Sequence, residues 1–92
     1  MIYKNIKLEL EYQHYITVNC RSITYYIVKA YVKNNDDEFV FFDEYKSNTI
    51  YSSLEAALED LRLFGWIDEN EKWKLSKQEK SLYEKVSDEL VY

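Results

Sequence analysis

The first part of the chain alternates apolar and polar side chains. In "IKLELEY", residues 6–12, every second position is apolar, which is the period-two pattern of a strand with one buried face. The alternation resumes in "YITVNC", residues 15–20, and predicts a second short strand with Cys20 on its inner face. A turn is then expected at Gln13 and His14. On this interpretation Cys20 is a small buried side chain, as free cysteines usually are.

The next segments predict a hairpin. "SITYYIVKAYVK", residues 22–33, is dense in β-branched and aromatic side chains on both faces, which suits a central strand better than an edge strand. "NNDDE", residues 34–38, is typical of a turn, and "FVFFDEY" then returns as a strand. We therefore expect Tyr25–Lys33 to pair with Glu38–Lys46 in an antiparallel meander.

Beyond residue 50 the apolar positions take helical spacing. Ser52 and Glu55 have the S-x-x-E spacing of a capping box, and Gly65 is a candidate C-terminal cap. The helix between them has an apolar stripe made of Leu54, Ala57, Leu58 and Leu61. Ser76 and Glu79 repeat the capping box before a second stripe, made of Leu82, Val86 and Leu90. The pattern therefore predicts two helices in the second half of the chain.

Together these elements predict an α+β fold in a single domain spanning residues 1–92. We expect an antiparallel meander of about four strands within residues 2–46, with a helix at 52–64 packed on it. The segment "GWIDENEKWKL", residues 65–75, is expected to be a short strand or a small hairpin before the C-terminal helix. A chain of 92 residues must bury most of its apolar side chains in one core.

The composition indicates a cytoplasmic protein. No apolar run approaches the roughly 20 residues that a membrane-spanning helix requires. The segment Met1–Asn5 lacks the charged and apolar regions of a signal peptide, and a single cysteine fits a reducing compartment. Ten Tyr and two Trp side chains exceed what so small a core must bury. A homodimer through a sheet edge or the last helix is therefore a further expectation.

Acidic side chains are concentrated in the middle of the chain. Residues 1–35 hold five basic and two acidic side chains, residues 36–71 hold two and eleven, and residues 72–92 hold five and four. A surface that keeps concentrated carboxylates despite their mutual repulsion can attract a basic partner. The candidate partner-binding residues are Asp36, Asp37, Glu38, Asp43, Glu44, Glu55, Glu59, Asp60, Asp68, Glu69 and Glu71. The alternative is that these side chains only confer solubility.

No pattern in the sequence indicates catalysis. His14 and Cys20 are the only imidazole and thiol, and the chain has no glycine-rich phosphate loop, no Ser/His/Asp arrangement and no metal-ligand spacing. Adjacent acids such as Asp36 and Asp37, or Asp43 and Glu44, could bind a metal ion, but such pairs in turns are ordinarily solvated. We expect a protein that is not an enzyme and that needs no cofactor or metal.

In its size, its strands-then-helices order, its acidic centre and its lack of a catalytic motif, the chain is similar to the small acidic inhibitor proteins of phages and other mobile elements, notably those of the anti-CRISPR type. The resemblance implies a non-catalytic protein that binds a nucleic-acid-processing host defence enzyme, such as a CRISPR effector, in the cytoplasm of the host cell. Such proteins act by placing carboxylates where phosphates would bind or by blocking a conformational step. The partner would then present a basic surface to the acidic residues.

Two nucleic-acid-binding alternatives remain. "LFGWIDENEKWKLSKQEK", residues 63–80, has the order of the C-terminal half of a winged helix, with residues 52–64 as recognition helix and Asp68–Lys72 as wing. Both segments are net negative, which would repel DNA phosphates, so no duplex DNA binding is expected. The second alternative is a sheet face that stacks single-stranded RNA or DNA bases, made of Tyr25, Tyr26, Tyr31, Tyr45, Lys29 and Lys33. A small regulatory interaction domain is also consistent with the pattern.

Overall fold

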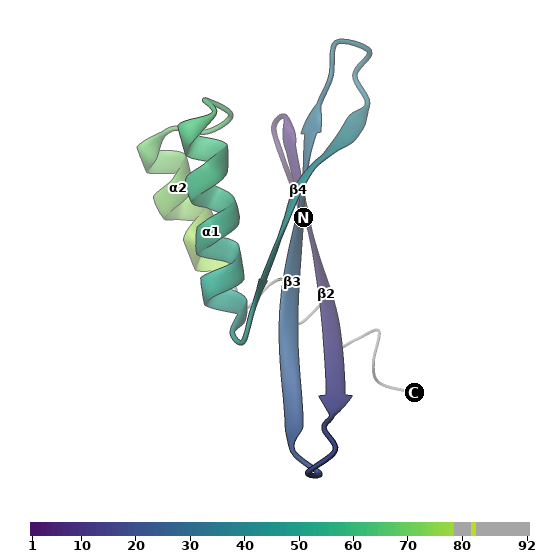
Figure 1. Cartoon of the computed structure of the whole chain (residues 1–92). Coiled ribbons are helices and arrows are strands. Elements are labelled where there is room, and N and C mark those ends of the chain that lie inside the picture. The colour runs from purple at the N-terminus through teal and green to yellow at the C-terminus, as the bar shows by residue number, and fades with distance from the viewer. Residues whose placement is uncertain (79–81, 83–92) are drawn as a thin grey trace.

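A four-stranded antiparallel sheet occupies the first half of the chain (Figure 1). The computed structural model describes residues 1–78 and residue 82. The strands follow one another across the sheet in chain order, as β1 (Ile2–Tyr3), β2 (Ile6–Ile16), β3 (Ser22–Lys33) and β4 (Phe39–Ser47). The predicted hairpin of residues 25–33 with 38–46 is confirmed, and β3 is an interior strand because it pairs with both β2 and β4.

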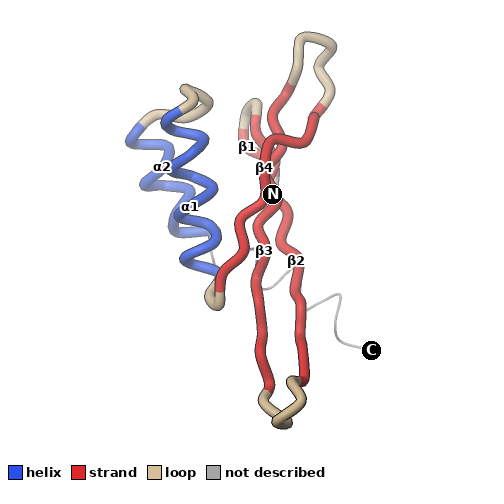
Figure 2. The backbone as a smooth tube through the Cα atoms, in the orientation of Figure 1, coloured by secondary structure: helices blue, strands red, loops and turns tan. Residues whose placement is uncertain are grey.

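The helices lie on one face of this sheet (Figure 2). They are α1 (Ile50–Leu63) and α2 (Glu69–Leu75), followed by the short 3-10 helix Ser76–Gln78. The predicted α+β arrangement, with the first helix packed on one antiparallel sheet, is therefore confirmed. The predicted C-terminal helix lies outside the described residues except for Leu82, which is helical and buried. None of the described helices has the length and apolar character needed to cross a membrane.

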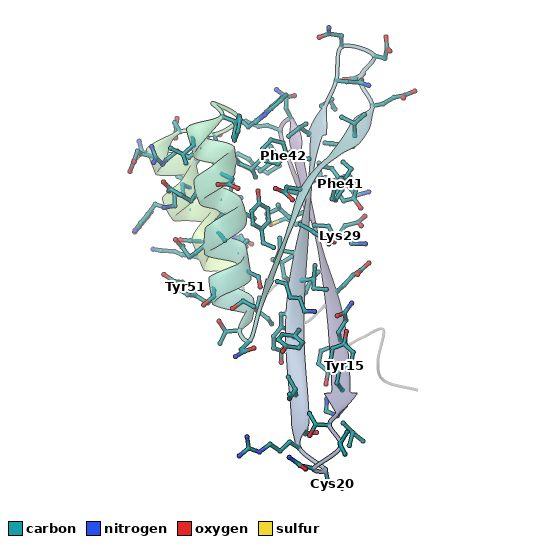
Figure 3. All side chains as sticks on the ribbon, in the orientation of Figure 1. Tyr15, Cys20, Lys29, Phe41, Phe42 and Tyr51 are labelled. Carbon is teal, nitrogen blue, oxygen red and sulfur yellow. The ribbon has the colours of Figure 1, made fainter. Side chains whose placement is uncertain are left out.

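The core lies between α1 and the sheet. Alternation along β2 and β3 directs the side chains of even-numbered residues toward the helix, so Leu8 stands beside Ala30 in the ladder. The fully buried members include Leu54, Leu58 and Leu61, which are the stripe predicted from helical spacing. In β4, Phe42 points toward α1 and packs against this core, whereas Phe41 points away and is exposed (Figure 3).

Helix α1 begins earlier than predicted. Thr49, not Ser52, is the N-cap, because the Thr49 hydroxyl oxygen accepts the backbone N–H of Ser52 at 3.1 Å. Ser52 therefore lies within the first turn, and its spacing to Glu55 does not form a capping box at the helix start. Thr49 is a favoured N-cap residue type, and its backbone is extended, with φ −130° and ψ 149°.

The C-terminal end of α1 agrees with the prediction. Gly65 has φ +82°, a conformation that favours glycine. Its N–H donates to the Arg62 carbonyl at 3.0 Å, and the Trp66 N–H donates to the Leu61 carbonyl at 2.8 Å. These two bonds are the Schellman arrangement that closes many helices.

The strand predicted at residues 15–20 is wrong. β2 continues through Gln13 and His14 to Ile16, and the chain reverses at residues 17–21 instead. There the Thr17 hydroxyl accepts the Arg21 N–H at 3.0 Å, and Cys20 is exposed with φ +60° rather than buried. The apolar alternation of "ITVNC" is therefore incidental, because the residues that carry it form the tip of the β2–β3 hairpin (Figure 3).

The prediction of a strand or small hairpin at residues 65–75 is also wrong. Asp68 caps α2, since its carboxylate accepts the Glu71 N–H at 2.7 Å while the Glu71 carboxylate accepts the Asp68 N–H at 3.2 Å. This reciprocal capping box starts a helix at a place where a short strand or small hairpin was expected. Ile67 and Leu75 are buried against the core, whereas Trp73 is exposed.

Candidate functional site: the acidic end and the outer sheet face

The acidic candidates are unevenly placed over the molecule. The β3–β4 turn, which carries Asp36, Asp37 and Glu38, lies at the same end of the molecule as the connection between α1 and α2 (Figure 1). The β2–β3 turn lies at the opposite end. The molecule measures 47 × 26 × 21 Å along its principal axes, so the two ends are well separated. We call the β3–β4 turn with the start of α2 the acidic end.

Ion pairs within the molecule neutralise several acids of the helices. The Glu59 carboxylate forms ion pairs with Arg62 at 2.6 Å and with Lys72 at 2.7 Å. Arg62 also pairs with Glu69 at 3.5 Å, and Lys72 also pairs with Glu55 at 3.8 Å. Hydrogen bonds from Arg62 and then from Lys72 lower the pKa of Glu59 to about 2. These three carboxylates share two cations between α1 and α2, so the ion pairs join the two helices and balance part of the negative charge inside the molecule.

Two further acids connect the helices to the sheet. Glu71 pairs with Lys4 at 3.0 Å, and this hydrogen bond, followed by the one from the Asp68 N–H, lowers the pKa of the Glu71 carboxyl. Asp60 accepts the Tyr45 hydroxyl at 2.8 Å. Burial and then this bond raise the pKa of Tyr45. Among the predicted partner-binding residues, Asp60, Asp68 and Glu71 thus have structural roles.

The remaining acids lie in the β3–β4 turn and on β4. Within the described residues, no ion pair involves Asp36, Glu38, Asp43 or Glu44. Asp37 lies 3.3 Å from Lys33, but its side chain is 85% exposed. The turn is held by Asn34, whose side-chain oxygen accepts the N–H groups of Asp36 and Glu38 at 2.9 and 3.0 Å. This turn therefore presents three carboxylates on an ordered backbone.

The outer face, which is the face of the sheet opposite α1, has mixed charge. Lys29 pairs with Glu11 at 2.7 Å, and Lys7 pairs with Glu9 at 3.0 Å. Lys46 lies over the Tyr25 ring at 4.4 Å from the ring centroid. The ion pair with Glu11 raises the pKa of Lys29. The cations on this face are thus already engaged by carboxylates or aromatic rings.

The six residues predicted to stack nucleic-acid bases lie on two opposite faces of the sheet. The ladder positions place Tyr25, Lys29, Tyr31 and Lys33 on the outer face. Tyr26 and Tyr45 lie on the other face, where Tyr45 packs against the core. The structure therefore brings together four of the six residues of this set.

Sequence reasoning missed the contrast between the two ends. From Tyr12 to Asn35 the chain has no Asp or Glu, although 17 acids are distributed over the rest. This segment forms most of the β2–β3 hairpin, and its tip is apolar and exposed at Ile16 and Val18. The gap in the acids is visible in the sequence, but only the topology shows that it forms the end of the molecule opposite to the acidic turn (Figure 2).

Among the described residues, no group of three or more His, Cys, Asp or Glu side chains is placed to hold a metal ion. The two ring nitrogens of His14 lie 3.1 Å from the Thr24 hydroxyl and 3.0 Å from the Ser22 hydroxyl, on the exposed hairpin. A shallow depression of about 330 Å³ between the helices is lined by Tyr51, Glu55, Glu69, Lys72, Trp73 and Ser76. Its acids are the ones already paired with Lys72 and Arg62.

Comparisons of the chain with protein-family models, with curated proteins and with solved structures found no match. The function must therefore be inferred from the geometry and charge of the chain itself.

Proposed function

We propose that the protein is a non-catalytic inhibitor that binds a basic surface of a nucleic-acid-processing enzyme, such as a CRISPR effector, through its acidic end. The host would be a cell that carries such a defence enzyme, and binding would take place in its cytoplasm. The observation that supports this proposal is the β3–β4 turn, where Asp36, Asp37 and Glu38 gather at an exposed tip. Their mutual repulsion is unfavourable in the free protein and is relieved by a cationic partner.

Ion pairs within the molecule reduce the number of predicted acidic residues that are available to contact a partner. The carboxylates of Glu55, Glu59, Glu69 and Glu71 already hold Lys72, Arg62 or Lys4, so a partner would have to break these pairs to use them. Among the described residues, Asp36 and Glu38 of the turn are in no ion pair, and Asp37 is in one exposed ion pair with Lys33. We therefore assign the main contact to residues 36–38, with Asp43 and Glu44 on the adjoining strand.

The turn is also suited to binding because it is ordered before a partner arrives. Asn34 bonds two backbone N–H groups of the turn, and the Asn34 N–H donates to the Glu38 carbonyl at 2.8 Å. A preordered loop loses less conformational entropy on binding than a disordered one. Carboxylates held in this way can occupy positions where the enzyme would otherwise bind phosphates.

A charge-matched pair of variants tests this assignment. Asp36→Asn with Glu38→Gln removes two negative charges from the turn, and both side chains are exposed. Val18→Lys with Asn19→Lys makes the same change in net charge at the opposite, exposed turn. Each variant is added in stoichiometric amounts to purified guide-loaded RNA-guided nucleases, and cleavage of labelled target DNA is measured.

Wild type and the Val18/Asn19 variant should inhibit one of these nucleases, and the Asp36/Glu38 variant should inhibit it less. The difference should shrink above about 0.15 M salt, where charge attraction is already screened beyond roughly 8 Å. Equal inhibition by both variants would mean that the acidic turn only confers solubility. If wild type inhibits none of the nucleases, the inhibitor proposal loses its support for that class of enzyme.

The outer face supports a second candidate, binding of single-stranded nucleic acid. Tyr25 and Tyr31 lie on this face with Lys29 and Lys33, and a nucleic acid would have to displace Glu11 from Lys29 and Asp37 from Lys33. Aromatic rings beside cations can stack bases without sequence preference. Wild type would then shift labelled single-stranded RNA or DNA but not duplex DNA, and Tyr25→Ala would abolish the shift. Absence of a shift with wild type would exclude this candidate.

A further inference from the structure

The outer edge of β2 is only partly covered by the strand beside it. β1 pairs with Ile6 and Lys7 alone. The next position, Leu8, bonds to Met1 in both directions: the Leu8 N–H donates to the Met1 carbonyl at 2.8 Å, and the terminal ammonium donates to the Leu8 carbonyl at 2.8 Å. Within the described residues, no strand pairs with this edge beyond Leu8.

The antiparallel ladder determines which backbone groups this edge presents. In such a ladder, a residue directs both its N–H and its C=O to the same neighbouring strand, and the direction alternates along the chain. Leu8 directs its groups away from β3, so the even-numbered residues that follow do the same. The outward groups beyond Met1 therefore belong to Leu10, Tyr12, His14 and Ile16.

This edge lacks the features that usually prevent pairing between chains. Edge strands are protected by charges, prolines, bulges or short length. Residues 10–16, "LEYQHYI", contain one charged side chain and no proline, and the β2–β3 register has no shift. On the opposite edge, β4 has a register shift beside Ala30 and carries Asp43, Glu44 and Lys46. Ile16 is 74% exposed on the unprotected edge.

We infer that the edge of β2 from Leu10 to Ile16 pairs antiparallel with the same edge of a second copy of this chain, with the two-fold axis at Gln13. Gln13 is the midpoint of the four outward residues, so this register alone lets all of them pair with one another. Leu10 faces the partner's Ile16, and Tyr12 faces the partner's His14. Each outward residue donates one N–H and accepts one across the interface, and the two sheets become one.

Neighbouring registers are less favourable. An axis at Tyr12 places Ile16 opposite the partner's Leu8, whose backbone groups are bonded to Met1. An axis at Glu11 brings that carboxylate face to face with its own copy, and directly opposed like charges are destabilising. An axis at His14 places Leu10 opposite the partner's Val18, which lies in the β2–β3 turn and not in a strand.

A cysteine at the axis tests the register. Gln13 is a non-hydrogen-bonded position of the new ladder, where opposed Cα atoms lie about 4.5 Å apart, within the range of a disulfide. In a Cys20→Ser background, Gln13→Cys should form a disulfide-linked dimer when diamide takes up the two thiol hydrogens. Glu11→Cys in the same background should not form this disulfide, because position 11 faces Tyr15 of the second copy and lies four positions from the second copy's own position 11. Equal cross-linking of both variants, or of neither, would overturn the register.

Sedimentation velocity over a concentration series tests the dimer itself. Wild type should sediment at twice the mass of the 11.2 kDa chain. Tyr12→Pro removes an outward N–H from both subunits without removing a β2–β3 bond, and should weaken the dimer more than about tenfold. The matched variant Lys46→Pro removes an outward N–H from the β4 edge and should leave the dimer unchanged. Circular dichroism checks that both variants keep the fold. A monomeric wild type, or a folded Tyr12→Pro dimer of undiminished affinity, would overturn the inference.

Discussion

Tyr45→Phe removes the hydroxyl group that joins β4 to α1. This hydroxyl donates to the Asp60 carboxylate at 2.8 Å, while the ring packs against the core. A hydrogen bond to a charged group contributes about 1.5–3 kcal/mol to the free energy of unfolding. Both side chains are only partly buried, so we expect a loss at the lower end, about 1.5 kcal/mol. For a domain of this size, that loss lowers the melting temperature by roughly 6–12 °C.

Urea unfolding at pH 7 and a fixed protein concentration measures this loss. A double-mutant cycle with Asp60→Ala isolates the coupling between the two side chains, because the double variant should lose little more than either single variant. Tyr51→Phe is the matched control, since Tyr51 is an exposed tyrosine on α1 and its variant should stay within about 0.5 kcal/mol of wild type (Figure 3).

A coupling free energy near zero would refute this reasoning. It would mean that the Tyr45 ring packing, and not its bond to Asp60, holds β4 against the helix. The result also bears on the inhibitor proposal, because Asp60 was among the acids predicted from the sequence to contact a partner. If the coupling is present, an Asp60 variant that loses binding does not identify Asp60 as a contact residue, because the loss can also follow from displacement of α1.

The sheet core and α1 could be predicted because their patterns are complete within short segments. β3 is dense in β-branched and aromatic residues, which suits a strand with a neighbour on each side. The four apolar positions from Leu54 to Leu61 define a helical period for α1. The position of the turn between β2 and β3 could not be predicted in this way. Alternation from Ile16 to Cys20 continues past the point where the chain reverses, and the reversal depends on pairing with β3.

Helix α2 was not predicted because its seven residues, "ENEKWKL", contain only two apolar side chains, Trp73 and Leu75. Two apolar positions do not establish a helical period, although the D-x-x-E spacing of Asp68 and Glu71 is a helix-start signal in the sequence. The charge pattern was informative only in part. The pair of Glu59 with Arg62 follows from their spacing on one helix, but the pair of Glu71 with Lys4 joins residues that only the fold brings together. Sequence alone could not separate acids with internal partners from acids that face solvent.

The core, the end of α1 and the ion pairs between the helices give three further tests. Leu58→Ala should lower the free energy of unfolding by about 3 kcal/mol in urea titrations, because Leu58 is fully buried. Gly65→Ala should cost about 1 kcal/mol through its positive φ, since no atom lies within 4 Å of an added Cβ. Below pH 4.5, the melting temperature of wild type should fall because Glu59 takes up a proton. Its pKa is lowered from 4.5 to about 2 by Arg62 and Lys72, so its contribution is complete above pH 4.5 and is lost as the pH falls toward 2. Glu59→Gln cannot titrate at this position, so its melting temperature should lie below that of wild type at pH 7 and approach it near pH 2 in calorimetric scans. A gap that stays constant over this range would contradict the role of the Glu59 carboxylate in joining the two helices.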